Sequence, residues 1–414
     1  MKIGYLLQAG VPDVRAQSLS GPALHVKHVF DELRGLGHDV KLLAQLDNQL
    51  WLTKDLVHYQ QVVVPRHDRG PLRLFESLVR RIQYEFHLPY AALFESARYA
   101  AAVRQTLGDR ELFYERMGWF GYAGAWAARQ LRVPLVLEVN GDHLTEFEML
   151  GTAPKGMQLA ISKWLMGWTA RHAAHAITTG EGWRKRHIER WDIAPDKVTS
   201  IQNGSEVVNL LAREQLRCYQ ASGEQNNGKL EIVYIGAFDP WHGLTILIKA
   251  AAKARARGVP LHLTVIGGGK EQEAIERTIA ETEMADIVTL TGYLKAHQFA
   301  PLLAQAEIGA SPYCGRAEYT GLKMLDYKAA GLVTLTSGEN GQPDIIRHGE
   351  TGWIVPPCNE DALAEAIVSL YRAPAQRQQM GRAAREEAER LHSWHHVAEE
   401  LVNLFERLNA YDRK

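Results

Sequence analysis

Residues 311–357 read SPYCGRAEYTGLKMLDYKAAGLVTLTSGENGQPDIIRHGETGWIVPP, and this stretch is the most informative in the chain. The apolar spacing after Gly321 predicts a helix, and Lys323 lies in its first turn. Thr320 is a typical N-cap residue for such a helix. Because the free N–H groups and the dipole at a helix start attract anions, this segment suits the phosphate groups of a ligand.

Two carboxylates flank this predicted helix start. Glu318 precedes it, and Asp326 lies one turn beyond Lys323, where it can hold a diol such as that of ribose. The alternative is that Lys323 and Asp326 form an ion pair on a solvated helix face, which is a common surface feature. The rest of the chain favours the ligand site.

Length and composition indicate a two-domain globular enzyme. A chain of 414 residues is longer than one core usually serves, and 46% hydrophobic with 23% charged residues is an ordinary balance. The net charge of −1 gives no support to a nucleic-acid partner. We find no export signal and no apolar run that could span a membrane, so we expect a cytoplasmic protein that can still rest on the inner face of a membrane. Three distant cysteines without a CxxC pair indicate a reducing compartment: Cys218, Cys314 and Cys358.

The first half of the chain alternates strands and helices. IGYLL at 3–7 is a buried strand pattern, a loop that contains Gly21 follows, a helix starts near Pro22, and DVKLLA at 39–44 is the next strand. This order is typical of a doubly wound parallel sheet, in which ligands bind beyond the carboxyl ends of the strands. The loop at Gly21 should therefore border a site. A GxGxxG motif is missing here, which argues against a dehydrogenase.

Polar side chains gather where two later strands end. Glu115 and Arg116 end one strand, where they either contact a ligand or form an internal pair that fixes the loop. Several polar groups crowd the end of the apolar strand at 133–139, and we interpret them as part of a sugar-contacting loop. Its members are Glu138, Asn140, Asp142 and His143.

Residues 70–106 are predicted to be mostly helical, with arginines and aromatic residues interleaved. They form either a packed helix pair or an interfacial face that touches lipid or a large acceptor. We favour ordinary packing, because amphipathic helices with aromatic residues more often belong to a core.

The second half repeats the alternation after a polar stretch. We expect an N-terminal Rossmann-like domain at 1–208, a linker at 209–229, a second Rossmann-like domain at 230–390, and a helix at 391–414 that packs back on the first domain. A cleft between two such domains is a favoured place for a sizeable ligand.

These motifs together resemble a known family, the family-4 (group 1, glycogen-synthase-like) retaining glycosyltransferases of the GT-B fold. The resemblance is most specific from Ser311 to Ala366, where an acidic residue, seven residues and a second acidic residue (EYTGLKMLD) precede GQPDIIRHGETGWIVPP. Other motifs fall in the family's order: GHDV at 37–40, NG at 203–204, GAFDPWHG at 236–243 and IGGG at 266–269.

The resemblance implies α/β architecture with two doubly wound domains, the first for an acceptor and the second for a sugar nucleotide of the UDP or GDP type. Glu318 would contact the donor sugar, Asn140 and His143 would lie near it, and Asp326 would bind the ribose. The diphosphate and base would be held by the remaining matched positions: Gly21, Ala237, His242, Gly292, Tyr293, Tyr319, Thr320, Gly321, Leu322 and Lys323. Glu115, Arg116 and Asp142 are candidates for contact with the acceptor or sugar. The family needs neither metal nor cofactor.

Two departures from the family pattern concern the diphosphate. The family usually has Arg where this chain has Ala237, and Lys where it has His242. The resemblance thus predicts hexosyl transfer with retention. The alternatives are a catalytically silent sugar-nucleotide-binding subunit and a nucleotide-sugar epimerase of the same fold.

Overall fold

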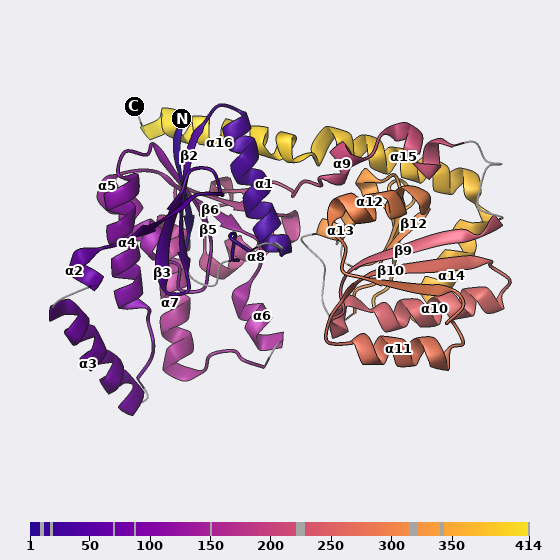
Figure 1. The fold of residues 1–414 in the computed structure, drawn as a ribbon, viewed down its shortest axis with the longest axis horizontal. Coiled ribbons are helices and arrows are strands. Elements are labelled where there is room, and N and C mark those ends of the chain that lie inside the picture. The colour runs from indigo at the N-terminus through magenta and orange to yellow at the C-terminus, as the bar shows by residue number, and fades with distance from the viewer. Residues whose placement is uncertain are drawn as a thin grey trace. The chain divides into compact units, whose positions relative to one another are not determined.

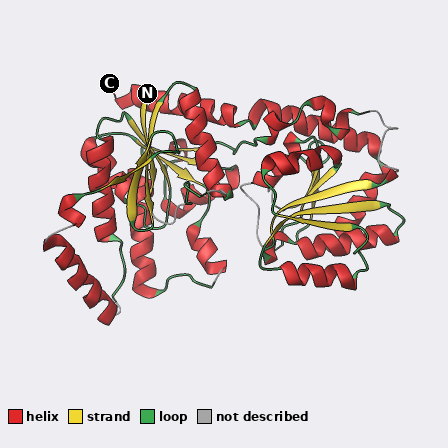
Figure 2. Cartoon of the chain, viewed as in Figure 1, coloured by secondary structure: helices red, strands yellow, loops and turns green. Residues whose placement is uncertain are grey.

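The chain forms two compact units in the computed structural model. Unit 1 comprises Met1–Ile201 with Ala398–Lys414, and unit 2 comprises Gln202–Val397. The structure describes residues 1–8, 12–16, 20–68, 71–86, 88–149, 151–220, 228–314, 321–339 and 343–412. Each unit consists of a sheet covered by helices (Figures 1 and 2).

Unit 1 is built on an eight-stranded sheet with the order β4-β3-β2-β1-β5-β6-β7-β8. Its strands are β1 (Lys2–Leu7), β2 (Asp39–Leu46), β3 (Gln49–Thr53), β4 (Tyr59–Val62), β5 (Leu112–Arg116), β6 (Leu135–Val139), β7 (His175–Thr178) and β8 (Val198–Ser200). The six strands from β2 to β8 in this order run parallel, whereas β3 and β4 add an antiparallel edge. The predicted doubly wound sheet is confirmed, and the antiparallel edge extends it.

Apart from the one-turn helix α2 (Pro65–Asp68), which buries no residue, the helices of unit 1 bury side chains in its core, with one exception described below. They are α1 (Gly21–Gly35), α2 (Pro65–Asp68), α3 (Pro71–Glu85), α4 (Leu93–Leu107), α5 (Ala123–Leu131), α6 (His143–Met149), α7 (Gly156–His172), α8 (Glu181–Trp191) and, from Ala398 onward, α16 (Trp394–Asp412). In α1, Val26, Val29, Phe30 and Leu33 are buried at helical spacing, and proline occupies the first turn as predicted. In α16, the buried Phe405 ring lies 5.5 Å from the ring of Tyr114 in β5.

Helix α3 is the exception. The packed pair predicted for 70–106 is right for α4, which buries Tyr99 and Val103, and wrong for α3, in which no residue from Pro71 to Glu85 is buried. Figure 1 places α3 at the periphery of unit 1. Its pattern matches a packed helix because periodicity shows that a helix has an apolar face and says nothing of what covers that face.

Unit 2 is built on a six-stranded parallel sheet with the order β11-β10-β9-β12-β13-β14. Its strands are β9 (Leu230–Ala237), β10 (Leu261–Gly268), β11 (Val288–Gly292), β12 (Ile308–Ser311), β13 (Val333–Ser337) and β14 (Gly352–Val355). Its helices are α9 (Val207–Leu210), α10 (Leu244–Ala256), α11 (Gln272–Glu281), α12 (Ala296–Gln305), α13 (Leu322–Ala329), α14 (Glu360–Arg372) and α15 (Pro374–Leu391). Parallel strands place all their carboxyl ends at one edge, which is where a site is expected.

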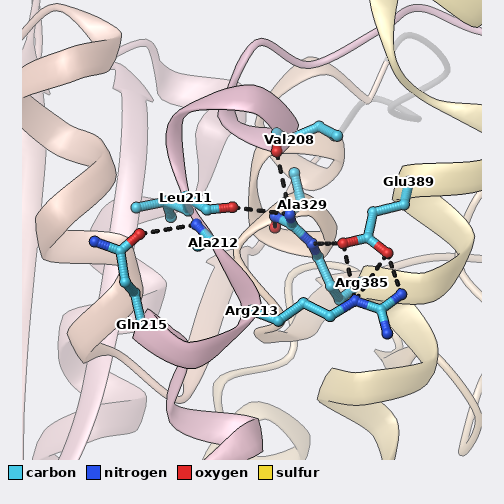
Figure 3. A network of polar contacts seen from close by, with 8 residues as sticks. All are labelled: Val208, Leu211, Ala212, Arg213, Gln215, Ala329, Arg385 and Glu389. Atoms are coloured by element: carbon cyan, nitrogen blue, oxygen red, sulfur yellow. Dashed lines mark hydrogen bonds and ion pairs between the residues drawn. The ribbon is translucent and has the colours of Figure 1, made fainter.

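The predicted linker at 209–229 differs from what the structure shows. Leu211, Leu216 and Cys218 are buried within unit 2, so the part of the predicted linker at 209–220 belongs to that unit. Figure 3 shows the contact that fixes it: the Arg385 guanidinium donates to the carbonyl oxygens of Val208 (3.1 Å), Leu211 (2.8 Å) and Ala329. Composition suggested a linker because the apolar residues here are few, yet those few face inward. Residues 221–227 lie outside the described part.

The cysteine prediction also needs correction. Cys314 and Cys358 form a disulfide, and Cys218 is a buried thiol. Cys314 follows β12 and Cys358 follows β14, whose ends lie two strands apart at the same sheet edge. Their separation of 44 positions along the chain hid this proximity in the sequence. Their oxidation contradicts the reading of all three cysteines as reduced thiols.

Candidate functional site

Lys323 lies at the carboxyl edge of the sheet in unit 2. Its Nζ is shielded from solvent and is 4.9 Å from the ring centroid of Tyr234 and 4.8 Å from that of Tyr313. A side chain at Gly236, the penultimate residue of β9, would place its Cβ 3.0 Å from this Nζ. Two aromatic faces therefore hold a cation directly above the end of the central strand.

Helix α13 begins beside this cation. Its N-cap is Gly321 rather than the predicted Thr320, and the φ of 58° at Gly321 lies in the left-handed region that glycine tolerates. A Cβ there would collide with the side chain of Ile345, so the residue is fixed by both backbone and packing. Leu322, the first helical residue, is exposed. Glu318, Tyr319 and Thr320 lie outside the described residues.

His242 is anchored next to the same edge. It ends the short 3-10 helix η5 (Pro240–His242), and its Nδ1 donates to the carbonyl oxygen of Ala237 (2.6 Å). Its ring meets that of Tyr313 edge to face at 5.1 Å. The structure thus brings Ala237, His242 and Lys323 around Tyr313 and Tyr234, as the family motif implies for a diphosphate site.

Asp326 turns toward the chain before the first strand of unit 2. Its Oδ1 accepts a hydrogen bond of 2.6 Å from the hydroxyl of Ser205, a buried residue that follows the NG motif. Burial raises the pKa of Asp326 to about 7, opposed by the Ser205 hydrogen bond and assisted by the charge of Glu206. The carboxyl is therefore poised between its neutral and ionised forms near neutral pH. Its hydrogen bond joins it to Ser205, and its role in ribose binding stays a prediction.

Beneath the site, a buried ionic network supports α13. Lys328 donates to the carbonyl oxygen of Ile345 (2.8 Å) and to Glu387, which also pairs with Arg347. Burial lowers the pKa of Lys328 against the raising effect of Glu387. Burial alone would raise the pKa of Glu387, but His392, Lys328 and Arg347 hold it well below its ordinary value. Sequence reasoning missed this network, because a lysine within an amphipathic pattern looks like a solvated residue.

Gly292 ends β11 at the same edge, and Tyr293 follows it. Gly292 has a φ of 72°, and the side chain of Tyr293 is 70% exposed. An exposed aromatic ring at this edge can stack on a planar group such as a nucleobase.

In unit 1, a buried polar cluster lies where β5 and β6 end. Glu138 Oε1 is 3.0 Å from Nδ1 of His25 and 3.4 Å from Nη1 of Arg116, and Glu138 Oε2 accepts from the hydroxyl of Tyr5 (3.3 Å). Asn140 donates to the same carboxylate. Burial alone would raise the pKa of Glu138, but His25 and Arg116 hold it below its ordinary value. His25, on α1 just after Gly21, was missed, because helical phase alone did not show that it faces Glu138.

Glu115 does not join this cluster. It is 1% exposed, its carboxylate lies under Gly124 of α5, and neither oxygen has a hydrogen-bond partner among the described residues. Burial raises its pKa well above the ordinary value. Arg116 points to the opposite face of the sheet, since side chains alternate along a strand. Neither the predicted acceptor contact nor a pair between Glu115 and Arg116 fits this placement of Glu115.

The loop after β6 is tied to α8 rather than open. Asp142 pairs with Arg190 (2.6 Å) and accepts from Thr145 (2.8 Å), and His143 Nε2 donates to the carbonyl oxygen of Met117 (3.1 Å). The cavity that Asp142 and His143 line holds about 20 Å³. That is enough for a water molecule and too small for a sugar ring. Of the predicted group, Asn140 remains with the cluster at Glu138, while Asp142 and His143 do not.

A larger cavity of about 440 Å³ opens beyond the end of β1 in unit 1. It is lined by carboxylates, amides and aromatic rings, among them Gln8, Gln45, Glu95, Tyr90 and Trp119. Gln8 is fixed by Ser96 (3.1 Å) and by the N–H of Ala123 (2.9 Å). Hydrogen-bonding groups beside ring faces suit a hydroxyl-rich ligand.

Two family profiles match the chain. The one described as Glycosyl transferases group 1 matches residues 219–387, and the one described as Glycosyl transferase 4-like domain matches residues 20–204. The chain belongs to the group 1, family-4-like glycosyltransferases. As a member it is a transferase that takes a sugar from a nucleotide-sugar donor.

Curated relatives and solved structures agree with this assignment. The chain is 25% identical over 300 residues to amylovoran biosynthesis glycosyltransferase AmsK of Erwinia amylovora, covering 70% of this chain and 69% of that one. It is 24% identical to MMP alpha-(1->4)-mannosyltransferase of Mycolicibacterium hassiacum, with 94% and 95% covered. The crystal structure of Anabaena Alr3699/HepE in complex with UDP superposes with a TM-score of 0.70 at 16% identity, covering 98% and 100% of the two chains. The fold is therefore GT-B, as predicted.

Proposed function

We propose that this glycosyltransferase moves a hexose from a UDP- or GDP-sugar to an acceptor hydroxyl, with retention of anomeric configuration and without a metal ion. The observation that carries the proposal is Lys323, a shielded cation between Tyr234 and Tyr313 at the start of α13. A cation together with the positive end of a helix can neutralise a leaving diphosphate.

In the proposed step, the bond from the anomeric carbon to the phosphate oxygen breaks as the bond from that carbon to the acceptor oxygen forms. The acceptor proton passes to the departing phosphate oxygen, so no protein nucleophile is required. Lys323 and the N–H groups at the start of α13 stabilise the negative charge that develops on the diphosphate. His242, held by Ala237, supplies a further donor when its Nε2 carries a proton.

We assign the other parts of the donor to further residues of unit 2. We assign the ribose to Asp326, the base to the vicinity of Gly292 and Tyr293, and the donor sugar to Glu318. Support for the donor class comes from relatives: Anabaena Alr3699/HepE has been crystallised with UDP-glucose, and a Mycobacterium tuberculosis relative, 27% identical over 197 residues, is described as GDP-mannose-dependent. We assign the acceptor to the cavity at Gln8 and Trp119 in unit 1, whose lining suits hydroxyl groups.

The test is calorimetry with UDP and GDP, followed by donor hydrolysis without acceptor. We expect Lys323→Ala to weaken nucleoside-diphosphate binding by roughly 1.5–3 kcal/mol, the range for a charged hydrogen bond. Lys249→Ala, which removes an exposed lysine on α10 that is not among the assigned residues, is the matched control. Unchanged affinity in Lys323→Ala would refute the proposal. Binding without any turnover would favour the alternative of a catalytically silent subunit, which is based on the departures from the family pattern at Ala237 and His242. NMR of the released sugar would test retention.

A further inference from the structure

Helix α3 exposes a continuous apolar face. Leu74 and Leu78 are 75% and 56% exposed, and Phe75, Ile82 and Phe86 are exposed beside them. Leu74, Leu78, Ile82 and Phe86 follow one another at intervals of four residues, and Phe75 lies three residues before Leu78, so they share one side of the helix and its C-terminal extension. In an ordinary globular protein such a face is covered by a core.

The polar side of α3 faces the protein. Arg80 binds Glu76 on its own helix (2.8 Å) and reaches Glu95 of α4, and Gln83 donates to the carbonyl oxygen of Pro89 (3.1 Å). The helix is attached to unit 1 by these polar contacts and by the Phe75 ring, which lies 6.1 Å from the ring of Phe94 in α4. The rest of its apolar side remains exposed. This orientation is the reverse of that expected for a helix of a water-soluble domain.

Helix α7 carries a further exposed aromatic side chain. Gln158 is bonded to both backbone groups of Tyr90, at 2.7 and 2.8 Å, which joins α7 to the loop after α3. Trp164, in the middle of α7, is 64% exposed. We call Leu74, Phe75, Leu78, Ile82, Phe86 and Trp164 the apolar patch. Exposed apolar surface of this extent marks an interaction site.

Positive charges accompany the apolar patch. Exposed basic side chains lie on each of the three helices that carry or flank it: Arg66 on α2, Arg73 and Arg81 on α3, and Lys163 on α7, with Lys155 just before α7. Of the two acidic residues of α3, Glu76 is engaged with Arg80 and only Glu85 is exposed. A basic rim around exposed aromatic and aliphatic side chains, with a tryptophan among them, complements the headgroup region of a bilayer.

We propose that the apolar patch docks unit 1 on the surface of a membrane that contains anionic lipids. None of the described helices is long and apolar enough to cross a bilayer, so the contact is peripheral. Tyr90, which joins the two helices of the patch, also lines the acceptor cavity, so docking brings that cavity to the headgroups. The proposal goes beyond sugar transfer and does not require the assigned donor chemistry.

The experiment is sedimentation of the full chain with vesicles of phosphatidylcholine alone or with roughly one third phosphatidylglycerol. We expect binding to the anionic vesicles and a loss of at least about tenfold in partitioning for Leu74→Ser/Leu78→Ser, since two large side chains no longer leave water. Arg81→Glu should weaken binding to anionic vesicles only. The matched controls are Leu210→Ser, an exposed leucine in unit 2, and Lys185→Glu, an exposed lysine on α8. Both should bind like the native chain.

Equal partitioning of the patch and control variants would overturn the proposal, as would the absence of vesicle binding by the native chain. A second copy of the chain would be the occupant if the patch variants turned a dimer into a monomer and left vesicle binding unchanged. A melting temperature and a circular dichroism spectrum like those of the native chain check that each variant is folded. Loss of donor turnover in a protein that still binds vesicles would contradict the proposed function and leave the docking surface intact.

Discussion

Replacing Asp326 by Asn should change how the stability of unit 2 depends on pH. The native carboxyl accepts a hydrogen bond from Ser205 and has a pKa of about 7, whereas its ordinary value is 3.8. The folded state therefore binds a proton that the unfolded chain has released over the range between these two values. In that range, the stability of the native protein falls as pH rises, by about 1.4 kcal/mol per pH unit. Below pH 4 Asp326 is protonated in both states and costs the folded state no stability. Above pH 7 the loss of stability has reached its full size.

The magnitude follows from the two pKa values. Between pH 5 and pH 8 the penalty on the folded state grows by about 2.6 kcal/mol, and partial access of solvent to Asp326 makes this an upper limit. Asn has the same shape and still accepts from Ser205, but it does not titrate. The free energy of unfolding of Asp326→Asn minus that of the native protein should therefore rise by about 2 kcal/mol from pH 5 to pH 8.

The assay is urea unfolding of both proteins at pH 5, 6, 7 and 8, taken as a difference so that other titrating groups cancel. Asp361→Asn is the matched control, because Asp361 is an exposed carboxylate of unit 2 whose pKa is lowered by Lys253. Its effect should be constant over this range. A pH-independent difference for Asp326→Asn would show that its carboxyl is not buried as described, and the assignment of ribose to this residue would lose its geometric basis.

Three further predictions concern a buried lysine, the disulfide and a buried carboxyl group. Lys328→Met should destabilise unit 2 by about 3–5 kcal/mol, because Glu387 loses a buried partner, and Lys328→Met/Glu387→Leu should recover part of this in urea unfolding; equal loss in both variants would contradict it. Reduction of the Cys314–Cys358 disulfide should lower the free energy of unfolding by about 2–4 kcal/mol, and Cys358→Ser should make the melting temperature insensitive to dithiothreitol. Glu115→Met should stabilise unit 1 by about 1–3 kcal/mol at pH 8 and by less at pH 5, since burial raises the pKa of Glu115 and penalises the ionised form. A variant less stable than the native protein at pH 8 would count against that account of Glu115.

The parallel strands of both sheets were predictable because most are short apolar runs bounded by glycine or polar residues, and such runs reflect burial on both faces. The antiparallel edge strands β3 and β4, which are more polar, were not predicted. What the sequence could not supply is which face each neighbouring side chain occupies. Glu115 and Arg116 are adjacent in sequence, yet one lies under Gly124 and the other reaches Glu138. The choice depends on where α5 packs, which is a tertiary fact.

The same limit explains the exposed helix and the disulfide. The pattern of α3 gave its helical period correctly, but the contacts that turn its polar side inward come from Glu95 and Pro89, which lie beyond the helix. Cys314 and Cys358 meet because β12 and β14, the strands that precede them, lie on either side of β13 and end at the same edge of the sheet. Local patterns predict elements, while partners depend on the order in which those elements assemble.

Helix α13 shows what such partners add to a motif. Its N-terminus is fixed by the packing of Gly321 on Ile345, its middle by Asp326 and Ser205, and its last carbonyl groups by Arg385, which donates to Ala329. An anion that binds at Lys323 therefore meets donors that are already ordered, and little conformational entropy is lost on binding. Weakening the support far from the ligand should consequently reduce affinity without touching any contact to it. Arg385→Met, measured by calorimetry with UDP at a temperature where the variant remains folded, tests this coupling directly: unchanged affinity would mean that the helix start is ordered by its own turn alone.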